Sequence, residues 1–502
     1  MVTGTTTIST TDAEPPLILA IDLGSSSARA VLYDRLARVV DGTLIQEKFQ
    51  LRTTGDGASE DDPDIALERT AHCVDAALSA AGPLATQIGA VAIDTLVSNI
   101  LAIDSAGMPL TPIITYADTR NALDADALRD SLDERTVHDR TGCMLRTSYW
   151  PARLNWFRRV KPDIWRNTAR WLTLGEYIEL RLFGRCRVSY SVASWSGLLD
   201  RHTLTWDEPL LNFLGVEPDH LSPLVDIDAP LQGLREPYAA RWPALRDIPW
   251  YPAVGDGAAA NVGSGCTNHD RIALTIGTSG AMRVVQDDVP QVPPGLWCYR
   301  VDRQRALLGG ATSEGGNVYG WLRRTLQLSS PTAIEAALAS STPDSHGLTV
   351  LPFLAGERSP DWAGDVQATI HGVTLATTPH EILQASLEAV AYRFALIEKR
   401  ICARPGCGHK LIASGGALLG SPAWMQMFAD VIGRTVVASA EPEATSRGTA
   451  LLALRSLGAI PSIEAVPAAD GEEYEPDSSR HTIYQAAIER QGRLYNRLIS
   501  QR

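Results

Sequence analysis

Residues 252–285, PAVGDGAAANVGSGCTNHDRIALTIGTSGAMRVV, decide the fold of this chain. Asp256 stands between two glycines, a pattern that predicts a tight turn carrying a carboxylate. Residues 272–285 form two apolar runs separated by Gly-Thr-Ser-Gly at 277–280, which predicts two strands joined by a turn. Because glycine lets backbone N–H groups approach a ligand closely, this turn is a candidate anion site. The stretch therefore pairs a candidate general base with a candidate phosphate-binding turn.

The same pattern occurs near the N-terminus. Residues 19–31, LAIDLGSSSARAV, align without gaps with residues 272–284, IALTIGTSGAMRV, so that Gly24 falls on Gly277. An internal repeat of this kind indicates two related halves, each with one phosphate-binding hairpin. The alternative is two ordinary buried hairpins with small turn residues. The candidate phosphate ligands are Gly24, Ser25, Ser26 and Ser27 in the first turn and Gly277, Thr278 and Ser279 in the second.

Composition narrows the class of protein. The chain has 502 residues, 45% of them hydrophobic and 21% charged, which predicts a globular protein of two or three domains. A net charge of −13 disfavours a nucleic-acid partner. No apolar run reaches the roughly 18 residues of a membrane span. Seven scattered cysteines favour a reducing cytoplasm over a disulfide framework. Residues 1–15 are expected to be a disordered tail and not a signal peptide.

Two clusters of polar residues raise the question of a metal. Asp22 ends a buried strand two residues before Gly24, where Mg²⁺, bound directly or through water, would offset the cost of burying a carboxylate. The alternative is an aspartate that caps the turn. Cys402, Cys407 and His409 lie close together in sequence, but their spacing is poor for zinc and a fourth ligand is missing.

Polar side chains also follow the predicted strands, and strand ends are where α/β sheets bind ligands. A strand over 88–95 ends at Thr95, with Ser98 just beyond it, and a strand from 113 ends near Asp118 and Arg120. These four residues are substrate-pocket candidates. A helix is predicted over 64–81, residues 121–180 are expected to be mainly helical with their tryptophans in the core, and residues 189–200 are expected to be a polar loop.

The C-terminal half repeats the strand–glycine–helix pattern. A helix is expected near Asn317, after the glycines at 315 and 316, and residues 378–381 predict a capping box. Residues 410–417 predict a strand that ends in Gly415, Gly416 and Ala417, followed by a helix capped at Ser421. A strand, glycines and a helix N-terminus together predict a nucleotide-sized anion site, although tight packing alone would also use small residues.

Five motifs in this order resemble those of the FGGY carbohydrate kinases, within the actin/hexokinase-like superfamily. They are residues 21–29, 255–257, 272–285, 412–417 and 443–450, and the resemblance covers about residues 17–500. It implies an α/β fold of two actin/hexokinase-like (ribonuclease H-like) lobes around a central cleft. We expect the N-terminal lobe over 16–262 and the C-terminal lobe over 263–502.

The resemblance also implies roles for individual residues. Asp256 would deprotonate a sugar hydroxyl, and Asp22 with Asp256 would hold Mg²⁺. ATP would contact both hairpin turns, Gly316 with Asn317, and residues 415–417. The sugar would contact Thr95, Ser98, Asp118, Arg120, Tyr149 and Asp256. The alternative class within the superfamily is a non-catalytic ATP-binding switch or a sugar-sensing regulator, which would need no such sugar pocket.

The substrate is the least determined feature. Residues 113–120, 141–143, 149–152 and 255–261 are most similar to bacterial gluconate kinases, with xylulose kinases second, so D-gluconate is expected to be phosphorylated to 6-phosphogluconate. Ser98 departs from the histidine usual in both groups, which leaves the sugar open. A gluconate site needs a cation for the carboxylate, and Arg120, Arg153 and Arg358 are the candidates. Membrane association is not expected, and a homodimer stays open.

Overall fold

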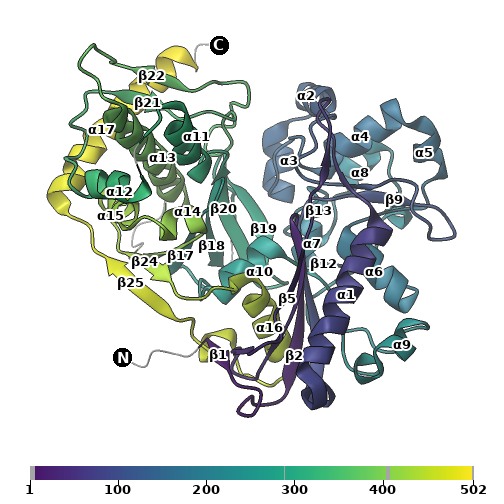
Figure 1. The fold of residues 1–502 in the computed structure, drawn as a ribbon. Coiled ribbons are helices and arrows are strands. Elements are labelled where there is room, and N and C mark those ends of the chain that lie inside the picture. Colours follow the sequence, from purple (N-terminus) through teal and green to yellow (C-terminus); the bar gives the residue numbers. More distant parts are fainter. Residues whose placement is uncertain (1–5, 288, 329, 403–407, 500–502) are drawn as a thin grey trace.

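The computed structural model describes residues 6–287, 289–328, 330–402 and 408–499. Two α/β halves lie side by side, each built on a seven-stranded sheet (Figure 1). The first sheet has the order β1 (Thr7–Ile8), β4 (Val39–Val40), β3 (Ser27–Tyr33), β2 (Leu17–Leu23), β8 (Ile88–Thr95) and β16 (Val254–Gly255), with β5 (Ile45–Lys48) also paired to β3. The second has the order β19 (Trp297–Arg300), β20 (Ala306–Thr312), β18 (Gly280–Gln286), β17 (Arg271–Ile276), β23 (Lys410–Ser414), β24 (Val436–Ser439) and β25 (Asp470–Tyr474).

The two sheets share one plan, as the sequence repeat predicts. In the first, β2 runs antiparallel to β3 and parallel to β8, which is parallel to β16. In the second, β17 runs antiparallel to β18 and parallel to β23, which is parallel to β24. The gapless alignment therefore superposes β2 on β17 and β3 on β18, so the repeat reflects two related sheets.

Alternating side chains of the first sheet pack against helices on both faces. One face packs on α1 (Pro63–Ala81) and α6 (Leu174–Phe183), and the helix expected over 64–81 is thereby confirmed. The other face packs on α10 (Asp256–Gly263) and α16 (Ala444–Ser456). Helix α16 thus packs on the first sheet although it lies within the segment 263–502 that we assigned to the C-terminal lobe.

Helices α10 and α16 cross at a pair of glycines. A Cβ atom on Gly448 would lie 1.9 Å from the Ala259 carbonyl oxygen, and one on Gly263 would lie 1.7 Å from that of Ala444. Only glycine allows backbones to approach this closely. The Arg447 side chain fixes the crossing by donating a hydrogen bond of 2.7 Å to the Gly263 carbonyl. The motif at 443–450 therefore connects the two halves physically.

The second sheet buries its apolar side chains under five helices: α11 (Gly316–Thr325), α12 (Pro331–Ala339), α13 (Pro379–Ile401), α15 (Pro422–Ile432) and α17 (Ser478–Leu498). The capping box at Thr378 and Glu381 is present at the start of α13, and the Ser421 side chain caps α15. Strands β21 (Thr349–Leu351) and β22 (Thr369–His371) form a separate hairpin at the far end of this half (Figure 1).

The remaining elements extend the first half. Helices α2 (Ala122–Ser131), α3 (Glu134–Thr141), α4 (Trp150–Val160), α5 (Pro162–Asn167) and α8 (Glu208–Leu214) surround Trp150, Trp156 and Trp171, which are buried as expected. Smaller elements of this half are β6 (Arg52–Thr53), β7 (Ser59–Asp61), β9 (Leu101–Ile103), β10 (Ile113–Ile114), β11 (Arg170–Leu172), β12 (Val188–Ser189), α7 (Tyr190–Ser194), β13 (Leu199–Asp200), β14 (Thr205–Trp206), β15 (Leu224–Val225) and α9 (Tyr238–Arg241). Helix α14 (Gly416–Leu419) belongs to the second half.

Three local expectations need correction. Part of the expected N-terminal tail is ordered, because Thr7 and Ile8 pair in parallel with Val39 and Val40. The expected polar loop at 189–200 contains the buried helix α7, whose serines satisfy backbone groups rather than water. Asp256 does not lie on a tight turn but is the first residue of α10, with Gly255 as its N-cap.

Candidate active site

Three carboxylates meet at one edge of the first sheet. Asp22 lies near the end of β2, Asp94 lies directly across from it on β8, and Asp256 follows β16. Val254 pairs with Asp94, so the three strands bring the acids to the same edge. Asp94 is fully buried, and sequence reasoning missed it because it sits inside an otherwise apolar strand. The detectable signal was an aspartate within a strand predicted to be buried.

The partners of these acids differ. Asp22 accepts a hydrogen bond of 3.1 Å from Arg29, and Asp94 accepts one of 2.8 Å from Thr449 on α16. Asp256 accepts one of 2.7 Å from the N–H of Gly257. Burial raises the pKa of Asp22, and it raises that of Asp94 further, with the neighbouring Asp22 charge adding to it. Burial raises the pKa of Asp256 to about 6.

Buried polar atoms without a partner surround Asp256. They are Oδ1 of Asp94, Nε1 of Trp195 and Nε of Arg283. The indole of Trp195 packs against the backbone on both sides of Asp256: a Cβ on Gly255 would lie 2.8 Å from its Nε1, and one on Gly257 would lie 3.2 Å from its Cη2. Because buried polar atoms are normally hydrogen-bonded, these atoms mark a place for a polar ligand.

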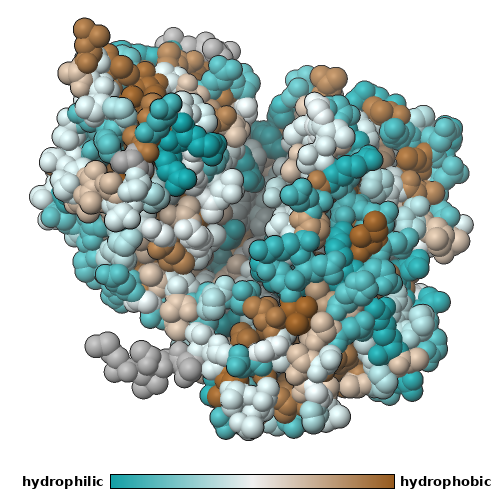
Figure 2. All heavy atoms as spheres, in the orientation of Figure 1, coloured by the Kyte–Doolittle hydropathy of each residue, from teal (hydrophilic) through white to brown (hydrophobic). Residues whose placement is uncertain are grey.

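Aromatic side chains from both halves form a wall beside this place. Trp195 stacks on Tyr299 with ring centroids 3.6 Å apart, and Tyr299 stacks on Trp297 at 4.5 Å. The hydroxyl of Tyr149, a predicted substrate residue, lies 2.6 Å from that of Tyr299. Tyr149 therefore lies at the base of the groove between the halves, which Figure 2 shows as a hollow in the surface.

The other predicted sugar residues are engaged elsewhere. Thr95 is fully buried, and its hydroxyl donates to the Leu96 carbonyl. The Ser98 hydroxyl donates to the Trp195 carbonyl at 2.7 Å, so it supports the aromatic wall. Asp118 accepts from the Ser59 N–H and pairs with Arg120 at 2.7 Å. These strand-end residues each have a protein partner that ties loops together, and their contact with the sugar stays a prediction.

The three arginines proposed to bind a substrate carboxylate differ in their protein contacts. Arg120 pairs with Glu60 at 2.7 Å as well as with Asp118. Arg153 is buried and donates to the carbonyls of Ser98 and Thr115, and burial lowers its pKa to about 9. Arg358 makes no ion pair within the described residues and lies over the ring of Trp362 at 5.7 Å. Of the three, Arg358 alone keeps its guanidinium available.

The second hairpin turn is shaped as a ligand cradle. Thr278 and Ser279 are exposed, and a Cβ on Gly277 would meet no atom within 4 Å. The N–H groups of Gly316 and Asn317 donate to the carbonyls of Gly277 and Thr278 at 2.8 and 3.1 Å. They therefore support the turn, and the predicted contact of Gly316 and Asn317 with ATP stays a prediction.

The first hairpin turn is less exposed than the second. Its Ser26 is exposed, Gly24 and Ser25 are half-buried, and Ser27 is buried with its hydroxyl 3.1 Å from the amide of Gln46. A Cβ on Gly24 would lie 3.0 Å from the Ser27 carbonyl and 3.5 Å from Oδ1 of Asp22. Ser27 thus belongs to the sheet, and the turn offers Gly24, Ser25 and Ser26 next to the acidic cluster.

A cavity of about 760 Å³ opens beside the second turn. Gly416 and Ala417 line it together with residues from three helices: Tyr319, Arg323, Thr332, Glu335, Ser421 and Trp424. Gly415 has φ of 90° and starts α14, which places Gly416 and Ala417 at the wall. A Cβ on Gly416 would meet no atom within 4 Å. The cavity has the size and position for a nucleoside next to the phosphate turn.

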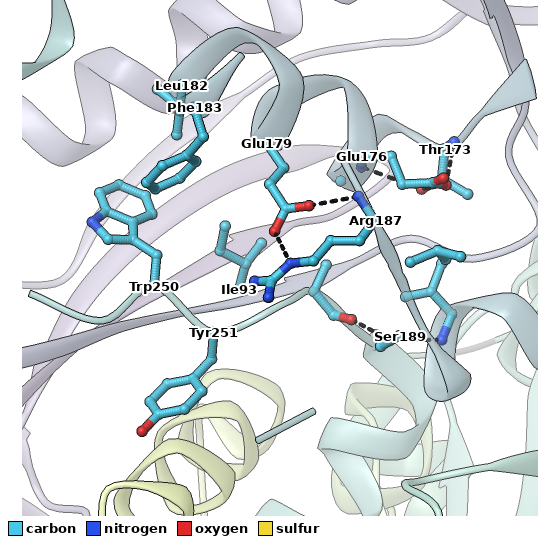
Figure 3. A pocket seen from close by; sticks show the side chains of 14 residues that line it. Ile93, Thr173, Glu176, Glu179, Leu182, Phe183, Arg187, Ser189, Trp250 and Tyr251 are labelled. Carbon is cyan, nitrogen blue, oxygen red and sulfur yellow. Dashed lines mark hydrogen bonds and ion pairs between the residues drawn. The ribbon is translucent and has the colours of Figure 1, made fainter. Parts of the chain in front are cut away.

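A different cavity lies behind the first sheet, among Thr173, Glu176, Glu179, Arg187 and Trp250 (Figure 3). Its acids have partners: Glu176 accepts from the N–H and hydroxyl of Thr173, and Glu179 pairs with Arg187 at 2.9 Å. It does not contain the acidic cluster. In the second half, His409 contacts Cys402 at 3.5 Å and Glu398 at 3.2 Å, whereas Cys407 lies outside the described residues.

Among the helices that the structure describes, none is long and apolar enough to cross a membrane.

Two family descriptions match the chain in sequence order. The FGGY family of carbohydrate kinases, N-terminal domain, matches residues 17–263, and the C-terminal domain of the same family matches residues 272–457. Together they cover most of the chain. Their meeting point, between residues 263 and 272, falls in the segment that joins α10 to β17.

Similar proteins carry three kinds of name. The gluconokinase of Bacillus subtilis (strain 168) is 29% identical over 478 residues, which are 93% of this chain and 91% of that protein. A xylulose kinase of Staphylococcus epidermidis is 25% identical over 479 residues, 93% of this chain and 94% of that one. A glycerol kinase of Rhodospirillum centenum is 29% identical over 463 residues, 89% of this chain and 90% of that one.

A solved structure establishes the fold. The crystal structure of gluconate kinase from Lactobacillus acidophilus superposes with a TM-score of 0.89 at 23% identity, covering 96% of this chain and 98% of that one. The two halves are accordingly actin/hexokinase-like domains, which confirms the expected fold class. From its acidic cluster, its duplicated hairpins and matches along most of its length, the chain belongs to the FGGY family of carbohydrate kinases, phosphotransferases that act on sugar hydroxyl groups.

Proposed function

We propose that this kinase transfers the γ-phosphate of ATP to the primary hydroxyl of an open-chain sugar acid, D-gluconate, to give 6-phosphogluconate. The observation that carries the proposal is the ring of unpartnered polar atoms around Asp256: Asp94 Oδ1, Trp195 Nε1 and Arg283 Nε. Acceptor and donors together suit a chain of hydroxyl groups. The gluconokinase of Bacillus subtilis among the similar proteins supports the choice of sugar.

Asp256 has the position of a general base. Its carboxylate is held by a single hydrogen bond from Gly257, which leaves oxygen lone pairs for a substrate hydroxyl. A pKa of about 6 keeps it ionised at neutral pH while leaving it basic enough to take a proton as the hydroxyl attacks. The Trp195 indole fixes the Gly255 and Gly257 backbone around it, so the carboxylate is preorganised.

Kinases of this family use ATP, with Mg²⁺ as the usual metal. The residues present fit both groups. Asp22, Asp94 and Asp256 offer hard oxygen ligands of the kind that Mg²⁺ prefers, and Asp94 has an oxygen without a partner. The turns at 24–26 and 277–279 would hold the phosphates, and the cavity at Gly416 and Ala417 would hold the nucleoside. When bound, Mg²⁺ neutralises phosphate charge during transfer.

Two alternative functions rank below this one. A ketopentose such as xylulose is the second substrate candidate, supported by the xylulose kinase of Staphylococcus epidermidis. A non-catalytic ATP-binding switch is the candidate from another class, and it gives no reason for a preorganised carboxylate beside unpartnered donors. The cytoplasm is the proposed location, because seven cysteines scattered along the sequence favour a reducing compartment over a disulfide framework.

The test is a coupled ADP-release assay across gluconate, xylulose, ribulose, glycerol, erythritol and fuculose. The expected result is the highest kcat/KM for gluconate. A neutral sugar that exceeds gluconate tenfold would overturn the substrate and leave the kinase in place. ATP binding without phosphorylation of any of the six would instead favour the switch.

A further inference from the structure

Arg283 points toward the groove between the halves. Its strand neighbours Met282 and Val284 pack in the core of the second half, whereas Val285 packs with residues that face the first half. Since side chains alternate along a strand, Arg283 shares the face of Val285. A Cβ on Gly257 would lie 3.5 Å from Nε of Arg283, so the guanidinium lies beside the start of α10.

This guanidinium has no protein partner within the described residues, and its Nε is buried. Burial lowers the pKa of Arg283, and the Asp256 carboxylate acts against this shift. Asp256 cannot serve as its dedicated partner, because the same carboxylate must accept the substrate hydroxyl. Arg283 is therefore a cation that the protein holds near the reaction centre without neutralising it.

Arg358, in the same half, is a second cation of this kind, and its charge acts on Arg283. The acids nearest to it in sequence are occupied: Glu357 pairs with Arg393, and Asp361 pairs with Arg400 at 2.5 Å. Both pairings leave Arg358 without a carboxylate. It lies instead over Trp362, beside the hydroxyl pair of Tyr149 and Tyr299, whose pKa values its charge lowers against the effect of burial.

Two neighbouring guanidinium groups without acids repel each other, and an anion between them removes that repulsion. We infer that Arg283 and Arg358 form the subsite that binds the carboxylate of the sugar acid. The inference rests on the proposed function and deepens it, because it names the residues that would select an acid over a neutral polyol. The guanidinium fork matches a carboxylate through two parallel hydrogen bonds.

The transferred phosphate is the competing anion, and the geometry disfavours it. Arg283 lies three residues beyond the start of β18, about 10 Å along the strand from the phosphate turn. Asp22 lies on β2, separated by β8 from the strand β16 that leads into Asp256, whereas a Cβ on Gly257 would lie 3.5 Å from Nε of Arg283. Asp256 thus stands between the acidic, phosphate-binding side and the cationic side. In gluconate the reacting hydroxyl and the carboxylate are likewise at opposite ends of the chain.

The test compares gluconate with glucitol, which has the same hydroxyl chain and a neutral CH₂OH in place of the carboxylate. In Arg283→Gln and Arg358→Gln, the ratio of kcat/KM for gluconate to that for glucitol should fall about 10- to 100-fold, mainly through KM, which is the scale of one lost hydrogen bond to a charge. Arg283→Lys should restore part of the ratio. Arg181→Gln is the matched control: Arg181 lies on α6 over Tyr177 and also lacks an ion pair within the described residues.

Each outcome of this comparison either supports or overturns the carboxylate subsite. An unchanged ratio in both glutamine variants, with gluconate still the substrate of the parent, would overturn the subsite alone. Equal losses for gluconate and glucitol, with ADP binding and thermal melting like the parent, would assign Arg283 to phosphoryl transfer and overturn the subsite as well. A parent enzyme that prefers glucitol to gluconate would overturn the proposed substrate and the subsite together.

Discussion

The two hairpins have the same backbone arrangement but different side chains at matching positions. Asp22 on β2 occupies the place of Thr275 on β17, and their partners on the next parallel strand are Asp94 and Ser414. The first pair consists of two buried carboxyl groups, whereas the second consists of two hydroxyls 2.9 Å apart. The turns differ too: Leu23 pairs with Ala28 around four residues, but Ile276 pairs with Gly280 around three.

The difference shows how one duplicated hairpin backbone can serve two functions. The second turn is tightened by Phe394, whose Cζ would lie 2.5 Å from a Cβ on Gly280, so glycine stands where the first hairpin has Ser27. A neutral hydroxyl pair at the base of that turn adds no negative charge near a polyphosphate. The carboxyl pair of the first hairpin instead requires a cation or a proton, since two adjacent carboxylates repel each other. The acidic chemistry is thus confined to one half.

The largest expected effect is at Asp256, whose counterpart after β24, Glu441, is paired with Arg447 at 3.5 Å. Asp256→Asn keeps the size of the side chain and removes the base, so kcat should fall at least about 100-fold, the low end for general-base catalysis. ADP binding, measured by titration calorimetry, should match the parent because the nucleotide cavity lies in the other half. A variant that turns over within a few-fold of the parent would show that Asp256 is not the base.

Exchanging the pairs tests the comparison directly. Asp94→Ser gives the first hairpin a hydroxyl like that of the second, and activity at saturating ATP should fall about 10- to 100-fold, the usual range for residues that support a metal site. The Mg²⁺ concentration for half-maximal rate should rise. Ser414→Ala, the matched change in the second half, should cost only a few-fold. Equal losses at the two positions would mean that the halves do not divide the chemistry in this way.

Local patterns predicted the frame well. The gapless repeat at 19–31 and 272–284 fixed both hairpins, because strand period and turn glycines are local properties of the chain. The helix at 64–81, the capping box at Thr378 and the buried tryptophans were likewise readable from spacing and residue type. The family motifs singled out Asp22 and Asp256, and the structure places both at one edge of the first sheet.

Contacts between segments that are distant in the sequence could not be predicted from local patterns. Arg283 was read only as part of a strand, and its exposure to the groove depends on how β18 faces α10. The importance of Asp94 is visible only from its pairing with Asp22 and from the hydrogen bond that it accepts from Thr449, 355 residues further along the chain. Thr95, Ser98, Asp118 and Arg120 fit the strand-end rule, yet each is satisfied by a protein partner that only the folded chain supplies. Sequence patterns predicted a candidate site, and side-chain packing determines which of its polar groups lack a protein partner.

The pH dependence of the reaction tests the assignment of Asp256 as the base. Burial raises the pKa of Asp256 to about 6, and the base acts only when ionised. The value of kcat/KM should therefore rise with pH through about 6 and lie about tenfold lower at pH 5 than at pH 7, since one proton is lost. Initial rates in buffers of constant ionic strength would measure it. A flat profile between pH 5 and pH 8 would contradict the assignment of Asp256.

The smallest expected effect is on shape. The proposed base lies in the first half and the proposed nucleoside cavity in the second, so phosphate transfer would require the halves to approach each other, and helices α10 and α16 cross closely at Gly263 and Gly448. Hinge closure around a ligand is the usual motion of such two-lobed enzymes. Small-angle scattering should give a radius of gyration above about 23 Å, the value for a compact chain of this length, and a decrease with gluconate and a non-hydrolysable ATP analogue. Each ligand alone should give a smaller decrease than both together, because each contacts mainly one half. If the radius stays constant when both sites are saturated, the halves do not close, and the groove must already hold the hairpins at their working distance.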